Sequence, residues 1–141
     1  MTQLTDDQIF ERDKVCYEQN CEQFRAMNQL MWQVPLVAIT VTGGLWFAAI
    51  DVENAASFKG ALFMLAAVLD LALIFVLIRV RYVMGQYLRM IEAFNPGSFV
   101  RAPGNGLFTR SHVVIFAFSA ALLIAAAASV LGIFKPDWLQ F

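Results

Sequence analysis

Residues 60–78 read GALFMLAAVLDLALIFVLI, an apolar run that contains a single ionisable side chain, that of Asp70. A helix of this length rises about 28 Å, which nearly spans the hydrocarbon core of a bilayer, roughly 30 Å thick. Similar apolar runs lie before and after it, at 31–50 and 112–134. The sequence therefore predicts three transmembrane helices, with Asp70 near the middle of the second.

The composition agrees with a membrane protein. Of the 141 residues, 60% are hydrophobic and 15% are charged, and the mean hydropathy is +0.63. Soluble domains are about 45–50% apolar and about 25% charged. The composition excludes an ordinary soluble enzyme, a secreted disulfide scaffold and a disordered tail. We therefore expect an all-α polytopic membrane protein.

The charges indicate an orientation. The segment 51–59 contains two acids and one lysine, whereas 79–111 contains five arginines and a single glutamate. An excess of Lys and Arg marks the cytoplasmic side of a membrane protein. We therefore expect 79–111 and the N-terminal segment 1–30 to be cytoplasmic, 51–59 to be an outer loop, and 135–141 to be an outer tail.

Residues 1–30 have the pattern of a cytoplasmic amphipathic helix. Thr5-Asp6-Asp7-Gln8 is a capping-box pattern, and no Gly or Pro follows before Pro35, so one helix can run into the membrane. Apolar positions recur every seven residues, at Phe10, Tyr17, Phe24 and Met31. This face either packs on the protein's own cytoplasmic loop or lines a self-association bundle, in which Asn20 sets the register.

The second helix is predicted to continue beyond the membrane. Between residues 79 and 94 the only helix breaker is Gly85, and Asn95-Pro96-Gly97 is a stop signal. The following residues, up to 106, are rich in Pro and Gly. We therefore expect a helical extension and then a basic, turn-rich loop, with the third helix starting near Ser111.

Asp70 is the residue that points most directly to function. A carboxylate inside the hydrocarbon core is costly, so it should face protein or water. One interpretation is a ring of carboxylates in an oligomeric pore, and another is a proton-binding site. The structural alternative is a protonated Asp70 that hydrogen-bonds to Thr40, Thr42 or a backbone carbonyl. Gln33, beside Pro35 at the cytoplasmic mouth of the first span, indicates either a gate or an entry bend.

Basic and aromatic residues gather on the cytoplasmic side, at Arg79, Arg81, Arg89, Arg101, Arg110, Tyr82 and Tyr87. Guanidinium groups among aromatic rings suit an anionic ligand that carries bases, such as a nucleotide or a short oligonucleotide. The positive-inside rule and contacts with lipid headgroups explain three of them, Arg79, Arg81 and Arg110, without a ligand. The pattern therefore predicts an anionic ligand or the lipid headgroups as its partner.

Small residues at four-residue spacing predict close helix packing, within one chain or between chains. They lie at Thr40, Gly44 and Ala48 in the first span and at Ala117, Ala121 and Ala125 in the third. Three helices make a thin bundle around a buried acid, so we expect a homo-oligomer of four or more chains. The predicted contact positions are Phe10, Tyr17, Asn20, Phe24, Gly44 and Ala121.

No pattern typical of catalysis or metal binding occurs in the sequence. His112 is the only histidine, and the spacing of Cys16 and Cys21 fits neither a CxxC pair nor a complete metal site. A glycine-rich phosphate loop and a nucleophile–base pair are also missing. We therefore expect no enzyme activity, no metal and no cofactor.

The charged N-terminal helix, the small number of spans and the Arg79-Val-Arg81 sequence below the membrane form a layout that resembles a known group of proteins. It is similar to the small membrane effectors of bacterial anti-phage systems, in particular the Hailong-type effector family. The resemblance implies a multimeric channel in the bacterial inner membrane. It also implies gating by an oligodeoxynucleotide that a partner nucleotidyltransferase makes.

Two other functions fit the same sequence. One is an accessory or docking subunit of a larger inner-membrane complex, with the N-terminal helix as the docking surface. The other is a proton-coupled element in which Asp70 cycles a proton, as the second-span carboxylate does in rotary-ATPase rings. This chain differs from those rings in its third span and its long N-terminal helix. A regulated channel or membrane-disrupting effector is the function that we predict.

Overall fold

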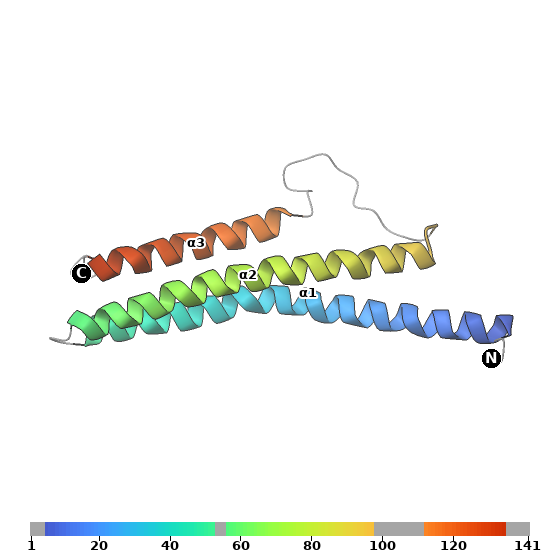
Figure 1. Cartoon of the computed structure of the whole chain (residues 1–141), viewed down its shortest axis with the longest axis horizontal. Helices are drawn as coiled ribbons and strands as arrows, with labels where there is room; N and C mark the ends of the chain where they lie inside the picture. The colour runs from blue at the N-terminus through green and yellow to red at the C-terminus, as the bar shows by residue number, and fades with distance from the viewer. Residues whose placement is uncertain (1–4, 53–55, 98–111, 135–141) are drawn as a thin grey trace.

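The structure, a computed structural model, describes residues 5–52, 56–97 and 112–134. These residues form three helices and no strand: α1 (Asp6–Asp51), α2 (Ala56–Phe94) and α3 (Val113–Phe134) (Figure 1). Each helix is long and apolar enough to cross a membrane. The prediction of an all-α protein with three helices of membrane-spanning length and composition is therefore confirmed.

α1 and α2 form a long antiparallel hairpin, and α3 packs beside α2 along only one part of it (Figure 1). The N-terminal part of α1 and the C-terminal part of α2 continue together past the start of α3 (Figure 1). We call this two-helix part, residues 6–30 and 79–94, the stalk, and the three-helix part the bundle. α2 contacts both other helices, whereas α1 and α3 touch each other at few places.

The helix ends follow the signals in the sequence. The Thr5 N–H group donates a hydrogen bond of 3.1 Å to the side-chain oxygen of Gln8, as the capping-box pattern predicts. α2 ends at Phe94, directly before the Asn-Pro-Gly stop signal. α1 passes through Pro35 without ending. α2 begins at Ala56, four residues before the predicted span, because backbone hydrogen bonding continues past the apolar run.

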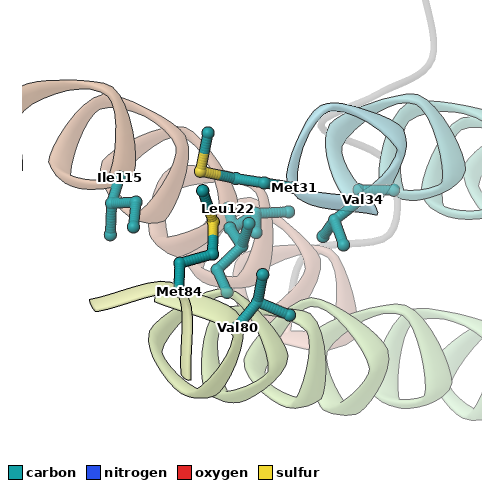
Figure 2. Packing of buried hydrophobic residues seen from close by; sticks show 8 residues of the cluster. Met31, Val34, Val80, Met84, Ile115 and Leu122 are labelled. Carbon is teal, nitrogen blue, oxygen red and sulfur yellow. The ribbon is translucent and has the colours of Figure 1, made fainter. Parts of the chain in front are cut away.

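The core lies where the three helices meet, near the stalk (Figure 2). Met31 and Val34 of α1 point toward Val80 and Met84 of α2 and toward residues of α3 (Figure 2). The α1 residues of this cluster alternate steps of three and four positions: Phe24, Met27, Met31, Val34 and Ala38. Phe24 and Met31 of the seven-residue pattern therefore lie on the face of α1 that packs within the chain, and self-association through the rest of the pattern stays a prediction.

The same α1 face continues along the stalk. The Tyr17 and Phe94 rings are stacked, with centroids 4.7 Å apart and an interplanar angle of 26°. Because Phe94 is the last residue of α2, the α1 residues before Tyr17 extend past the end of α2. Phe10 lies in this overhang and is 63% exposed, and Asn20 is half-buried. Contacts between copies of the chain at these positions stay a prediction.

α2 and α3 pack tightly at Gly132. A Cβ atom added there would lie 3.0 Å from the ring of Phe63, whose side chain is buried. Contacts this short force the ring or the helix to shift. A small residue is therefore required at this point of the α2–α3 interface.

We expect Gly132→Ala to lower the free energy of unfolding by about 1–3 kcal/mol relative to Gly60→Ala, because the methyl group overpacks against Phe63. A Cβ atom at Gly60 meets nothing within 4 Å, so this control carries the same change in helix propensity without the clash. Thermal unfolding in detergent micelles, followed by circular dichroism, measures the difference. Equal melting temperatures for the two variants would contradict the close approach.

Candidate functional site

Asp70 lies on α2 at the junction of the three helices and is completely buried, with 0% of its surface exposed. The hydroxyl group of Thr42, on α1, donates a hydrogen bond of 2.6 Å to Asp70 Oδ1. The exposed Thr40 instead donates to the backbone carbonyl of Leu36 in its own helix, at 2.9 Å. Of the two threonines suggested by the sequence, Thr42 is therefore the partner of Asp70.

The second carboxyl oxygen of Asp70, Oδ2, is buried and has no hydrogen-bond partner among the residues that the structure describes. Leaving a buried polar atom without a partner costs about 1–3 kcal/mol, and more for a charged group. Such an atom therefore calls for a proton, a water molecule, an ion or a group from another chain.

Asp70 lines a cavity of about 450 Å³ between α1 and α3, which we call the Asp70 cavity. Its walls are almost entirely apolar, and small residues such as Gly43 of α1 and Ala121 of α3 line it. Both of these residues are exposed, so the cavity opens at the outer surface of the bundle. Asp70 and Thr42 are the polar groups at its inner wall.

Two aromatic contacts connect α1 and α3 at the two ends of this cavity. Trp32 meets Phe118 edge-on, with ring centroids 5.6 Å apart. At the other end, Trp46 Nε1 donates a hydrogen bond of 2.8 Å to Ser129 Oγ, which donates to the Ala125 carbonyl at 3.0 Å. These contacts hold the two helices together on both sides of the gap. No sequence pattern pointed to the Trp46–Ser129 bond, because it depends on how α3 is rotated against α1.

The basic residues of α2 divide between two faces. Arg79, Tyr82 and Arg89 are exposed and follow spacings of three and seven residues, so they lie on one side of the helix. The Arg79 guanidinium carbon lies 5.5 Å from the centroid of the Tyr82 ring, within the range of a cation–π interaction. We call these three residues the stalk basic face.

The other predicted polar residues lie elsewhere. Arg81 is half-buried on the side of α2 that faces α3, and Tyr87 is half-buried on the stalk. Gln33 is exposed on α1. Arg101 and Arg110 lie outside the described residues. The predicted basic cluster is therefore not a single site within the described part of the chain.

Arg81 lines a second, larger gap of about 720 Å³ between α2 and α3, which we call the α2–α3 groove. Ser119 also lines it, and its buried hydroxyl has no hydrogen-bond partner among the described residues. Each of the two gaps beside α3 therefore has a lining residue with an unpartnered oxygen, Asp70 in one and Ser119 in the other.

The remaining predicted positions are simple to place. Gly44 is exposed, and a Cβ atom there would meet nothing within 4 Å, so it leaves room for a neighbouring helix. Cys16 and Cys21 of α1 are free thiols. Within the described ranges, no group of three or more His, Cys, Asp or Glu side chains has a metal-binding arrangement.

No protein-family model, curated protein or solved structure matches this chain. Its function is therefore inferred from the Asp70 cavity, the stalk basic face and the α2–α3 groove.

We expect Thr42→Val to lower the free energy of unfolding by about 1–2 kcal/mol, because it removes the hydroxyl group that donates to Asp70. Thr40→Val is the matched control, since that hydroxyl bonds only within α1. Thr42→Val combined with Asp70→Leu should regain much of the loss, because both polar partners are then absent. Unfolding in lipid bicelles measures all three variants, and equal stability of the two single variants would contradict the role of Thr42.

Proposed function

We propose that this chain is a homo-oligomeric channel or membrane-permeabilising effector of the bacterial inner membrane, with an ion path that passes Asp70. The observation that carries the proposal is the unpartnered Asp70 Oδ2 on the wall of the Asp70 cavity. An acid at the centre of a span costs about 2.5–3.5 kcal/mol when lipid surrounds it. Water or ions in a path between chains would remove this cost.

The lining of the cavity supports an oligomer. Gly43 and Ala121 are small residues at its opening, and Gly44 next to Gly43 leaves further room. Small residues allow the backbone of a second chain to approach closely. A neighbouring helix at this opening would separate Asp70 from lipid and complete a polar path with Asp70 on its wall.

The stalk is the part of the molecule that would receive a signal. The positive-inside rule predicts from its arginines that the stalk is cytoplasmic. The stalk basic face combines two guanidinium groups with an exposed aromatic ring, Tyr82, on which a base can stack. We therefore propose a nucleotide or short oligonucleotide as the gating ligand, made by a partner nucleotidyltransferase in an anti-phage system, as the resemblance implies.

Two other functions have support from specific observations. The 2.6 Å bond between Thr42 and Asp70 lies within one chain, as in a site that exchanges a proton without an open pore. The exposed Phe10 in the overhang of α1 suits a docking contact of an accessory subunit. The first function predicts proton coupling without conductance, and the second predicts a chain that is monomeric or unstable when isolated.

The decisive test is the mass of the purified full chain in nanodiscs, followed by ion flux through liposomes made from the same preparation. We expect an oligomer of four or more chains and measurable flux. Asp70→Asn keeps the shape of the side chain but removes its ability to carry a negative charge. This variant should change the flux about tenfold or more, because one charge at a pore wall changes the energy of a passing ion by at least about 1.4 kcal/mol.

Thr40→Val is the control for this experiment, because it removes a polar group of α1 that lies outside the cavity lining. It should leave both the mass and the flux unchanged. A stable monomer without flux would overturn the channel proposal and favour the accessory subunit. Proton uptake that Asp70→Asn abolishes, in liposomes without flux, would favour the proton-coupled element.

The gating proposal has a separate test. We expect a short oligodeoxynucleotide to change the flux, and we expect Arg79→Ala with Arg89→Ala to abolish its effect, because these guanidinium groups hold the phosphates. Lys14→Ala with Arg25→Ala removes the same charge from exposed positions of α1 and is the matched control. Flux that does not respond to the oligonucleotide in any variant would contradict this ligand class without affecting the channel itself.

A further inference from the structure

The α2–α3 groove is apolar along most of its length. Ile74 and Ile78 of α2 form one wall, and Phe116 and Leu123 of α3 form the other. Ile78, Phe116 and Leu123 are exposed, so the groove is open along the side of the bundle. Its apolar part lies within the segments of both helices that are long and apolar enough to cross a membrane, where the acyl chains of a bilayer would surround it.

The end of the groove nearest the stalk is polar. Arg81 and Tyr82 of α2 and His112, directly before α3, line this end. Arg81 has no ion pair or hydrogen bond with any residue in the described part of the chain. Arg81 is half-buried, so its guanidinium group at the groove is already partly shielded from water. The first backbone N–H groups of α3 lie at the same end, where the helix dipole also favours an anion.

We propose that the α2–α3 groove binds one anionic phospholipid, with the phosphate group at Arg81 and an acyl chain along the apolar walls. Ile74 and Arg81 are seven residues apart, so the groove runs about 10 Å along α2 from cation to apolar end. A phospholipid has this same order, with a negative headgroup at the membrane surface and hydrocarbon below it. Basic pockets between transmembrane helices bind such headgroups.

The polar end and the apolar walls of the groove together favour a phospholipid over other occupants. A free phosphate or nucleotide would use Arg81 but would leave the apolar walls uncovered, and a second copy of the apolar α3, which has no acidic side chain, would bury the Arg81 cation without a partner. Ser119 supports the same conclusion, because it lies about 10 Å below His112 along α3. Its hydroxyl has no hydrogen-bond partner among the described residues, so an ester group of the bound lipid is the partner that the proposal assigns to it.

The proposal goes beyond the channel and does not depend on it. Arg79 and Arg89 of the stalk basic face lie on a different side of α2 from Arg81, and Tyr82 borders both sites, so lipid binding and oligonucleotide binding use different arginines. A monomer without ion flux would still contain the α2–α3 groove. Failure of one proposal therefore leaves the other testable.

Native mass spectrometry of the purified full chain, titrated with phosphatidylglycerol or phosphatidylcholine, tests the proposal. We expect one phosphatidylglycerol per chain, bound about tenfold more tightly than phosphatidylcholine, and Arg81→Gln should remove most of this preference. Arg25→Gln removes an exposed cation of α1 and is the matched control, with the preference retained. Circular dichroism checks that each variant is folded.

A second pair of variants tests the groove without changing a charge. Ala120 lines the groove, so Ala120→Trp should fill it and reduce binding of both lipids about tenfold. Ala127→Trp places the same bulk at an exposed position outside the groove lining and should have no effect. Equal binding of the two lipids by the unmodified chain would overturn the proposal. So would a lipid preference that survives both Arg81→Gln and Ala120→Trp.

Discussion

The hydrogen bond between Thr42 and Asp70 determines how the hairpin is assembled. A carboxyl group in the middle of a membrane helix must turn away from lipid, and this fixes the rotation of α2 about its axis. Its bond to Thr42 then fixes how far α1 is shifted along α2. Tyr17 lies 25 residues before Thr42, and its stacking partner Phe94 lies 24 residues after Asp70, so one antiparallel register holds from the Thr42–Asp70 bond to the end of the stalk.

α3 is attached to this hairpin in a different way. Gly132 and Phe63 provide its close contact with α2, and the Trp46–Ser129 bond provides a contact with α1. Because α3 packs mainly on one side of the hairpin, the gaps on its two flanks are not filled by the chain itself. An unpartnered oxygen belongs to a residue on each flank. The surfaces that a second chain, water, ions or lipid would occupy are therefore the two sides of α3.

The hairpin was predictable from the sequence, but the position of α3 was not. The helices and most of their ends were predicted from the apolar runs, the capping box and the Asn-Pro-Gly stop signal. Each of these signals acts through local backbone chemistry. The seven-residue spacing of Phe24 and Met31 gave the inward face of α1, though it left open whether α2 or another chain would cover it. α3 is apolar on all sides, so its sequence contains no periodic signal for which side faces inward. The Asp70 cavity and the Trp46–Ser129 bond depend on that rotation and could not be inferred.

The division of the arginines follows from helix geometry alone once α3 is placed. Arg79 and Arg81 are close neighbours in the sequence. Residues two positions apart in a helix are separated by about 200° around its axis, so their side chains point to nearly opposite sides. A single ligand held by both would have to wrap around α2, and α3 packs against the side that Arg81 faces. Arg79 instead shares a face with Tyr82 and with Arg89, which lies well along the stalk. The same short basic sequence therefore presents Arg81 beside α3 and Arg79 on the stalk basic face, so the two ligands proposed above would contact different arginines of one helix.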